Sequence, residues 1–353
     1  MTMSAQQADA AGEYHPLRVK RVVPETADCC SLVLEIPAPL RARFAYKAGQ
    51  FLTFRIPVDG EPLLRCYSMS SSPHTDPDLK VTVKRIAGGR VSNWINDHVR
   101  AGDTLQASAP AGRFCLRDHH TAIVAFSGGS GITPVISIIK TALATTSRPI
   151  KLLYANRDVD SIIFADELDD LCRRYPSRLQ VTHHLDAADG FIKPAALKRL
   201  ICGNERADFY ICGPAPFMDL VEQALKEPAV DRNCIFIERF ISLPDNSVMP
   251  VLDEDTVSSA PTVIEEVTFI IRRTRHRVAY RAGDTLLETA RRAALRPPAS
   301  CESGNCATCM ARVKAGRVEM RVNNVLTAEE IAQGYVLTCQ GRPVEPGTVV
   351  EYE

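Results

Sequence analysis

The chain has 353 residues, more than the about 250 to 300 at which a single hydrophobic core usually divides, so two or three domains are expected. Its 42 Lys and Arg residues balance its 42 Asp and Glu residues, so the zero net charge gives no electrostatic reason to expect a nucleic acid partner. No apolar run reaches the ~18 residues that span a bilayer, and the N-terminus lacks the basic and apolar stretches of a signal peptide. We therefore predict a cytoplasmic protein without a membrane partner.

The first part of the chain has the texture of a small β-barrel. Residues 1–13 are rich in Ala, Gln and Asp and are predicted to form a disordered tail. Residues 14–117 contain short alternating apolar and polar stretches, separated by Pro and Gly pairs, which is typical of an antiparallel barrel. Strands are predicted at residues 17–23, 30–36, 50–56, 79–85 and 104–109.

Two segments of this region suit a flavin. The tetrapeptide Arg-Cys-Tyr-Ser at 65–68 offers a guanidinium for pyrophosphate, a ring to stack on an isoalloxazine and a hydroxyl for its reactive edge. The run Gly-Gly-Arg-Val-Ser at 88–92 precedes a helical stretch at 93–98, so it offers backbone amides and a helix dipole to a phosphate. Either segment alone is better explained by ordinary turn and N-cap chemistry. The two together, upstream of a nucleotide fold, favour a flavin.

Residues 118–242 alternate between strands and helices. This order predicts an open parallel sheet that is covered by helices, as in nucleotide-binding α/β domains. The predicted strands are 121–126, 150–155, 179–184, 208–211 and 234–237, and the predicted helices are 133–144 and 164–174.

Three motifs follow strands of this sheet, where ligands usually bind. The loop 127–134 is rich in glycine and could approach a pyrophosphate, but Pro134 replaces the third glycine of the strict fingerprint. In Asn-Arg-Asp at 156–158 the acidic residue favours NAD and the arginine favours NADP, so the residues leave the choice open. Cys212, in Cys-Gly-Pro, is either a buried thiol or part of a site, and the order of the motifs favours a site.

Four cysteines near the C-terminus have the spacing of a plant-type [2Fe-2S] cluster. A zinc site would need a second C-x2-C pair or histidines, and a disulfide would need an oxidising compartment. The predicted iron ligands are Cys301, Cys306, Cys309 and Cys339.

The C-terminal part begins with a segment of linker composition at 243–263, and residues 264–353 are predicted to form the cluster domain. A hairpin is predicted from strands at 267–271 and 277–280, followed by a helix at 285–294. The arginine-rich segment 272–277 of this hairpin could face an acidic partner, although a solvated turn is the simpler interpretation.

In chain order, Arg65-Cys-Tyr-Ser, Gly129-Ser-Gly-Ile-Thr-Pro134, Cys212-Gly-Pro and the cysteine set resemble the ferredoxin-NADP reductase superfamily with a plant-type ferredoxin fused at the C-terminus. Within it, segments 65–76, 81–85, 92–94 and 322–326 look most like reductase components of 3-ketosteroid 9α-hydroxylases. Reductases of phenylacetyl-CoA epoxidases and of Rieske oxygenases come next. The resemblance covers residues 17–352 and implies a multidomain fold: an antiparallel β-barrel flavin domain, an α/β parallel-sheet nucleotide domain and a β-grasp (α+β) ferredoxin domain.

The resemblance also implies cofactors and site residues. FAD is expected at Arg65, Cys66, Tyr67, Ser68, Thr82, Val83, Lys84, Gly89, Arg90, Val91 and Ser92. The nicotinamide nucleotide is expected at Gly129, Ser130, Gly131, Thr133, Cys212, Gly213 and Pro214, and, from their place after a strand, at Asn156 and Arg157. The expected catalytic residues are Ser68, Cys212, Glu238 and Phe240. Two residues of the cysteine loop depart from the family pattern, because Glu302 stands where a basic residue is common and Ala307 replaces a frequent glycine.

These features together predict an oxidoreductase that passes electrons from NADH, with NADPH as the other possible donor, through FAD and a [2Fe-2S] cluster. A hydride carries two electrons and an iron centre accepts one at a time, so a flavin and a cluster are needed between them. The expected acceptor is the Rieske-type terminal oxygenase of a multicomponent system, as in 3-ketosteroid 9α-hydroxylase. The alternatives are another acceptor, such as a phenylacetyl-CoA epoxidase or a hybrid-cluster protein, and a non-enzymatic redox sensor.

Overall fold

The computed structural model describes residues 14–226, 230–240, 264–299, 302, 304, 307–323 and 325–352. Within them the chain forms two compact units, one ending at Phe240 and one after it, and each is described by itself. The predicted tail at 1–13 and the predicted linker at 243–263 lie outside the described residues, so the domain boundaries stay predictions. No helix in the described part of the chain is both long and apolar enough to cross a membrane.

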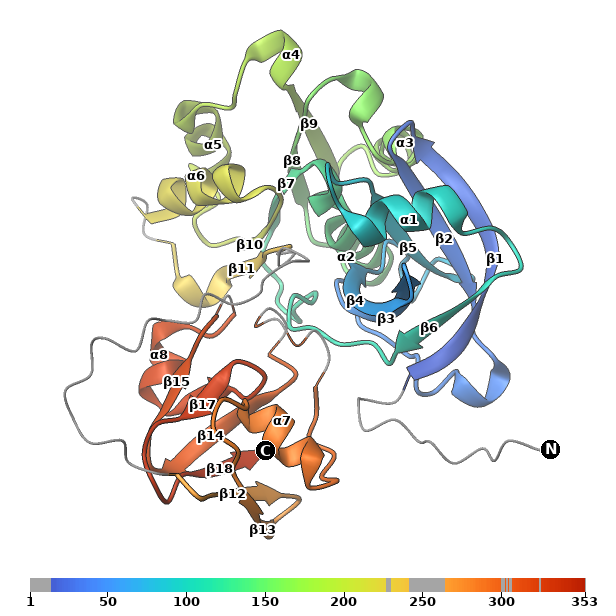
Figure 1. Ribbon diagram of the computed structural model, residues 1–353. Helices are drawn as coiled ribbons and strands as arrows, with labels where there is room; N and C mark the ends of the chain where they lie inside the picture. Colours follow the sequence, from blue (N-terminus) through green and yellow to red (C-terminus); the bar gives the residue numbers. More distant parts are fainter. Residues whose placement is uncertain are drawn as a thin grey trace. The chain divides into compact units, whose positions relative to one another are not determined.

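The first lobe of the N-terminal unit is a six-stranded antiparallel sheet with the order β4-β3-β6-β1-β2-β5 (Figure 1). A bridge between Met69, which follows β4, and Val81 of β5 joins its two edges, so the sheet closes into a barrel. Inward side chains such as Leu17, Val19 and Phe54 fill its core. The strands are β1 (Tyr14–Thr26), β2 (Cys29–Glu35), β3 (Phe51–Val58), β4 (Glu61–Ser68), β5 (Leu79–Lys84) and β6 (Thr104–Ser108).

Two local predictions in this lobe need correction. No strand was predicted at the tetrapeptide 65–68, which forms the end of strand β4 and pairs with β3 across Asp59 and Gly60. Helix α1 (Arg90–His98) begins three residues before the predicted position, because Gly89 is its N-cap and Val91 packs into the barrel core. The barrel therefore presents the amino end of α1, rather than a loop, after Gly89.

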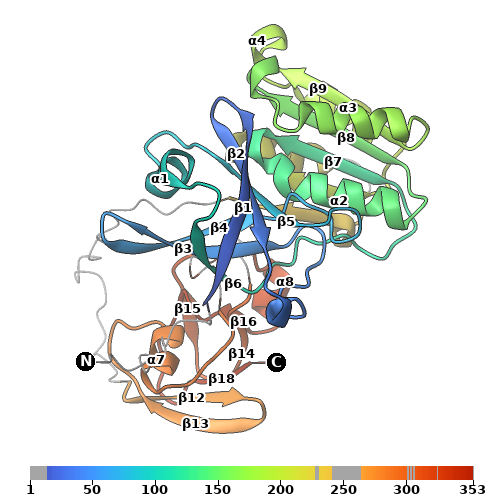
Figure 2. The same ribbon diagram turned by 90° about the vertical axis from the view of Figure 1, so that its right-hand side faces the viewer.

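The second lobe is a five-stranded parallel sheet with the order β11-β10-β7-β8-β9. Residues of β7 alternate between its two faces: Ala125 packs beneath α2 and α3, whereas Phe126 packs beneath α5 and α6. Figure 2 shows α2 and α3 side by side on one face. The elements are β7 (Ile123–Gly128), β8 (Ile150–Asn156), β9 (Leu179–Leu185), β10 (Asp208–Cys212), β11 (Ile235–Glu238), α2 (Ile132–Thr145), α3 (Ala165–Arg174), α4 (Asp186–Asp189), α5 (Pro194–Ile201) and α6 (Ala215–Lys226).

The strand order reverses at β7, because the chain moves from β7 to β8 and β9 on one side and then returns to β10 on the other. The loops that follow β7 and β10 therefore leave the sheet side by side at this topological switch point, and open α/β sheets bind ligands in the crevice at such a point. The fold places the predicted nucleotide motifs 127–134 and 212–214 on the two sides of this crevice.

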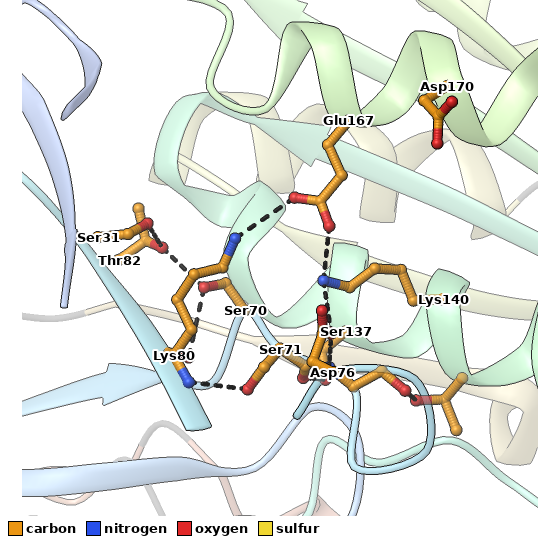
Figure 3. A network of polar contacts seen from close by, with 12 residues as sticks. Ser31, Ser70, Ser71, Asp76, Lys80, Thr82, Ser137, Lys140, Glu167 and Asp170 are labelled. Atoms are coloured by element: carbon orange, nitrogen blue, oxygen red, sulfur yellow. Dashed lines mark hydrogen bonds and ion pairs between the residues drawn. The ribbon is translucent and has the colours of Figure 1, made fainter. Parts of the chain in front are cut away.

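A buried polar network, which we call the lobe clamp, joins the two lobes (Figure 3). Lys140 of α2 is 5% exposed and lies 2.8 Å from Asp76, on the barrel side, and 2.7 Å from Glu167 of α3. Lys80 of β5 lies 3.4 Å from the same glutamate, and Ser72 shares a 2.8 Å hydrogen bond with Thr141. A buried cation between two carboxylates loses most of its stabilisation when a partner moves away, so the clamp resists changes in the angle between the lobes.

The C-terminal unit is a mixed five-stranded sheet with the order β13-β12-β18-β14-β16, packed against helix α7. The parallel pair β12 and β18 in its middle is typical of a β-grasp domain. Strand β13 begins three residues before the predicted position, because a two-residue turn joins it to β12. The elements are β12 (Glu266–Ile271), β13 (Thr274–Ala279), α7 (Leu286–Arg292), β14 (Met310–Ala315), β15 (Val318–Met320), α8 (Ala328–Ala332), β16 (Tyr335–Leu337), β17 (Gly341–Pro343) and β18 (Val349–Tyr352).

Candidate functional site

Three predicted catalytic residues meet in the N-terminal unit, and each is the last residue of its strand. Ser68 Oγ, at the end of β4, donates a 3.1 Å hydrogen bond to Glu238 Oε2, at the end of β11. Cys212, at the end of β10, stands opposite Glu238 in the parallel register. Phe240 follows two residues later and is 44% exposed, so its ring is free to cover a flat ligand. The barrel and the nucleotide lobe thus contribute to one site at the switch point.

The electrostatics of this site keep two ionisable groups neutral near neutral pH. Burial of the Glu238 carboxyl raises its pKa from 4.5 to about 8, and the hydrogen bond from Ser68 opposes this shift only in part. Burial of the fully enclosed Cys212 thiol raises its pKa well above the usual value, and Glu238 adds to the shift. Cys212 therefore acts as a small apolar side chain rather than as a thiolate nucleophile.

Strand β4 supplies the rest of the barrel side of the site. Tyr67 is half-buried, and its ring centroid lies 6.0 Å from that of Phe54. Burial raises the pKa of the Tyr67 hydroxyl, so the ring stays neutral. Arg65 donates a 2.9 Å hydrogen bond to the carbonyl of its neighbour Leu64. Cys66 lies 3.3 Å from Thr53 Oγ1 on the adjacent strand β3.

The other predicted flavin residues divide into two groups. The side chains of Thr82, Val83 and Val91 are buried in the barrel, so only their backbones remain for a ligand. Gly89, Arg90, Ser92 and Lys84 lie at the amino end of α1 and at the end of β5, and Arg90 is already ion-paired at 3.0 Å with Glu61. Contacts of these residues with FAD stay predictions.

The loops that follow β7 and β10 approach each other so closely that some of their positions have room only for glycine. A Cβ on Gly131 would lie 2.1 Å from the carbonyl oxygen of Cys212, and one on Gly128 would lie 2.8 Å from Pro214. Gly129 has a φ of +50°, and a Cβ there would meet only Lys84, at 3.9 Å. The loop is therefore open to a ligand at Gly129 and closed at Gly131.

One residue of this loop was missed by the sequence-based assignment of individual site residues. Ser127 is fully buried at the carboxyl end of β7, and its Oγ has no hydrogen-bond partner among the described residues. A buried hydroxyl without a partner is costly, so a ligand atom at the crevice is expected to satisfy it. Thr133 differs, because its hydroxyl already donates a 3.1 Å bond to the carbonyl of Ser130. The residues of the crevice therefore fit a bound nucleotide.

The charged residues at the end of β8 are both engaged. Arg157 is exposed and lies 3.0 Å from the carboxylate of Asp28. Asp158 caps a short helical turn by accepting a 2.9 Å hydrogen bond from the amide of Ser161. Asn156, the last residue of β8, is buried. The only cation of the triplet that is expected to read the ribose is thus already paired with a carboxylate, and the role of the triplet stays a prediction.

In the C-terminal unit, two of the four predicted cluster ligands are described, and Cys301 and Cys306 lie outside the described residues. Cys309 and Cys339 are both buried. Thr338 Oγ1 donates a 2.9 Å bond to the Cys309 carbonyl and accepts a 2.9 Å bond from Tyr352. Gln340 Nε2 lies 3.7 Å from Cys339 Sγ. Two thiols held beside one Thr–Tyr pair fit the donor set of an iron–sulfur cluster, and the four-cysteine arrangement itself stays a prediction.

The cysteine loop is held by side chains of the surrounding elements. Arg291 of α7 binds Glu302 through two hydrogen bonds, at 2.9 and 2.7 Å. The Glu302 carbonyl accepts a 2.9 Å bond from Gln340. Gly304 has a φ of +80° and would bring a Cβ within 2.9 Å of the Val322 carbonyl oxygen. The unusual Glu302 therefore has a structural partner, and it anchors the loop to α7.

Comparison with known proteins assigns all three parts of the chain. An oxidoreductase FAD-binding domain model matches residues 16–115, an oxidoreductase NAD-binding domain model matches 126–223, and a 2Fe-2S iron-sulfur cluster binding domain model matches 269–344. The chain is 41% identical over 342 residues to the ferredoxin reductase component of 3-ketosteroid-9-alpha-monooxygenase from Rhodococcus rhodochrous, which covers 95% of this chain and 96% of that protein. It is 34% identical to a component of the 1,2-phenylacetyl-CoA epoxidase from Escherichia coli, over 96% of this chain and 98% of that protein.

A solved structure has a similar fold over nearly the whole chain. Phthalate dioxygenase reductase superposes with a TM-score of 0.61 at 24% identity, covering 96% of this chain and 98% of its own. At this identity the likeness concerns the fold alone.

The fold and these matches define an oxidoreductase of the ferredoxin reductase type, with FAD, a nicotinamide nucleotide and a [2Fe-2S] cluster as its cofactors. The chain belongs to the family of ferredoxin reductases in which a C-terminal 2Fe-2S domain follows the FAD-binding and NAD-binding domains, the family of the Rhodococcus rhodochrous reductase component. The predicted fold class, enzyme class and cofactors are thereby confirmed.

Proposed function

We propose that this protein is the NADH-dependent reductase of a multicomponent oxygenase and delivers electrons to a terminal oxygenase of the 3-ketosteroid 9α-hydroxylase kind. The observation that carries the proposal is the convergence of Ser68, Cys212 and Glu238 at the switch point of a chain that also carries a 2Fe-2S domain. Relatives at 38–41% identity over nearly their whole length are named as reductase components of 3-ketosteroid-9-alpha-monooxygenase, which supports the steroid system.

Bound FAD and nicotinamide supply hydride transfer, and the cluster supplies single-electron transfer. The residues of the chain position these groups and set the protonation state of the site. The Ser68 hydroxyl donates a hydrogen bond to Glu238 at the end of β4, and the raised pKa of Glu238 keeps a proton on its carboxyl group at neutral pH. The buried Cys212 stays neutral and adds no charge beside Glu238, and the lobe clamp fixes the distance between the barrel and the nucleotide lobe.

NADH is the proposed donor. Arg157, which would otherwise bind the 2′-phosphate of NADPH, is paired with Asp28, and Asp158 is used as a helix cap. A tenfold or greater preference for NADH in kcat/KM is expected, and an equal preference would contradict this assignment.

A Rieske-type oxygenase is the acceptor that we propose, and we propose that the reaction takes place in the cytoplasm. An epoxidase is the second candidate acceptor, because the chain is 34% identical to a component of the Escherichia coli phenylacetyl-CoA epoxidase. Reconstitution separates the two: the loaded protein is mixed with NADH and either a 3-ketosteroid 9α-hydroxylase oxygenase or the epoxidase, and product is counted per NADH consumed. Coupled product formation with the steroid oxygenase alone is expected. Coupling with the epoxidase alone would reassign the acceptor, and coupling with neither would overturn the proposed function.

A further inference from the structure

The β12–β13 hairpin carries four arginines that the proposed electron path does not use: Arg272, Arg273, Arg275 and Arg277. All four are exposed. None of them forms an ion pair or a side-chain hydrogen bond with another described residue. The arginines of the neighbouring helix α7 behave differently, because Arg291 and Arg292 are paired with Glu302 and Asp284. The hairpin therefore presents a concentrated positive charge, which we call the arginine hairpin.

The turn of the arginine hairpin is strained in a way that the fold does not require. Ile271 pairs with Thr274, so Arg272 and Arg273 are the two central residues of the turn. Their φ angles are +51° and +66°, the left-handed region that type I′ hairpin turns need. Asn-Gly forms this turn without steric strain, whereas two arginines are unfavourable there. Folding therefore does not explain why two arginines occupy this turn. A binding partner that their side chains contact explains it better.

Protection of the sheet edge against aggregation explains only two of the four arginines of the hairpin. Strand β13 is an edge strand, and charged residues such as Arg275 and Arg277 discourage edge-to-edge aggregation. Residues of the turn form no part of that edge. Arg272 and Arg273 thus need a separate explanation.

The strand register places the turn at the end of the sheet where Cys309 and Cys339 lie, just outside β14 and β16. Ile271, the last residue of β12, stands opposite Tyr352 in β18. The hydroxyl of Tyr352 donates a hydrogen bond to Thr338 Oγ1, which in turn donates a hydrogen bond to the Cys309 carbonyl. Only β18 separates β12 from β14, the strand that follows Cys309, so the two strands are about 10 Å apart. An acceptor that approaches this end of the domain meets the arginine hairpin.

We propose that the arginine hairpin is a docking surface for an acidic face of the electron-acceptor protein. This inference rests on the proposed function, since it specifies how the acceptor is recognised. Unpaired guanidinium groups attract a carboxylate-rich surface over several ångströms and orient it before contact. Nucleic acid also carries negative charge, but the place of the hairpin beside the cluster ligands favours an electron acceptor over a polyanion.

The experiment uses the full chain loaded with FAD and cluster, and a variant that keeps the turn. Arg272→Asn/Arg273→Gly removes two charges and inserts the residues that type I′ turns prefer, so the hairpin is retained. The matched control is Lys314→Gln/Arg317→Gln, which removes two charges near the opposite end of β14, away from Cys309. The probes are cytochrome b5 as an acidic acceptor and cytochrome c as a basic acceptor.

We expect the bimolecular rate of cytochrome b5 reduction by the turn variant to fall about tenfold at low ionic strength, with the difference vanishing at high salt. The control variant changes that rate by less than about twofold, and cytochrome c reduction by the turn variant does not fall. Equal rates for the wild type and the turn variant, or equal losses in the turn and control variants, would overturn the proposal. Tight retention of the wild type, but not the turn variant, on duplex DNA at physiological ionic strength would assign the surface to nucleic acid instead.

Anaerobic reduction by NADH without any protein acceptor separates this proposal from the proposed function. If NADH reduces both centres in the wild type and the turn variant at the same rate, a docking failure concerns only the arginine hairpin. If NADH fails to reduce the wild type, the proposed function itself is wrong.

Discussion

The two redox regions of this protein are built in different ways. In the N-terminal unit, Ser68, Cys212 and Glu238 are each the last residue of a strand, so the sheets themselves set their positions. In the C-terminal unit, the cysteine loop is held by hydrogen bonds from Arg291 and Gln340 to Glu302. A site built on strand ends keeps its geometry when a side chain is replaced, as long as the backbone of the strands is unchanged. A site on a loop loses its geometry when a metal ligand or a side chain that holds the loop is replaced.

The largest effect is expected from removing a cluster ligand. Cys306→Ala should leave NADH reduction of the flavin within about twofold of the wild type and stop delivery to any one-electron protein acceptor, because the ligand set is incomplete. Stopped-flow absorbance and acceptor assays measure the two steps. The exposed Cys202 provides the control, since Cys202→Ala should change neither step. Undiminished delivery by Cys306→Ala would show that electrons bypass the cluster.

Gly131→Ala tests the claim that backbone contacts define the crevice. Its Cβ would lie 2.1 Å from the Cys212 carbonyl oxygen, so the loops after β7 and β10 must separate. We expect a loss of about 3 kcal/mol in the free energy of unfolding and severe loss of NADH reduction. Gly203→Ala is the control, because that glycine has a φ of +78° but no neighbour within 4 Å, so only about 1 kcal/mol should be lost. Equal losses in urea unfolding would contradict the claim.

Lys140→Met tests the lobe clamp. Removing this buried cation leaves Asp76 without its ammonium partner and Glu167 with Lys80 alone, so we expect a loss of about 2 kcal/mol in unfolding free energy. The rate of flavin reduction by NADH should fall as well, while KM for NADH changes little, because the lobes no longer hold a fixed distance. Lys140→Arg keeps the charge and should recover most of both losses. If the methionine variant reduces its flavin at the wild-type rate, the clamp contributes to stability alone.

The smallest effect concerns the pH dependence at Glu238. Its folded pKa of about 8 lies above the ordinary 4.5, so the folded state binds more protons between these values and loses stability as pH rises through that window. Flavin reduction should slow by about tenfold above pH 8 as the neutral acid is lost. Glu238→Gln should remove this inflection, and Ser68→Ala should move it upward because the Ser68 hydrogen bond lowers the pKa. Parallel profiles in all three proteins would exclude Glu238 as the titrating group.

Much of the fold follows from local patterns, and the exceptions have physical causes. The alternating strands of the barrel and the strand–helix order after residue 118 were predicted within a few residues. Strand β4 was missed because its side chains do not alternate between buried and exposed, five consecutive residues being half-buried, although Asp59-Gly60 is a typical hairpin turn. The amino end of α1 was misplaced because its first residues pack into the core.

The candidate site was predictable as a set of residues but not as a geometry. Ser68 and Glu238 are 170 residues apart, and nothing local encodes their hydrogen bond. The parallel register that sets Cys212 beside Glu238 depends on the assembled sheet. The lobe clamp has the same origin, because Lys140 looks like any charged residue of an amphipathic helix until Asp76 and Glu167 surround it.

The most direct test of the electron path is an anaerobic titration of the loaded protein with NADH, followed by flavin absorbance and by the electron paramagnetic resonance of the reduced cluster. The path predicts that flavin bleaching and the cluster signal both appear with NADH in the wild type, and that only flavin bleaching survives in Cys306→Ala. A flavin that NADH reduces while the intact wild-type cluster stays oxidised would contradict the path from nicotinamide through flavin to iron.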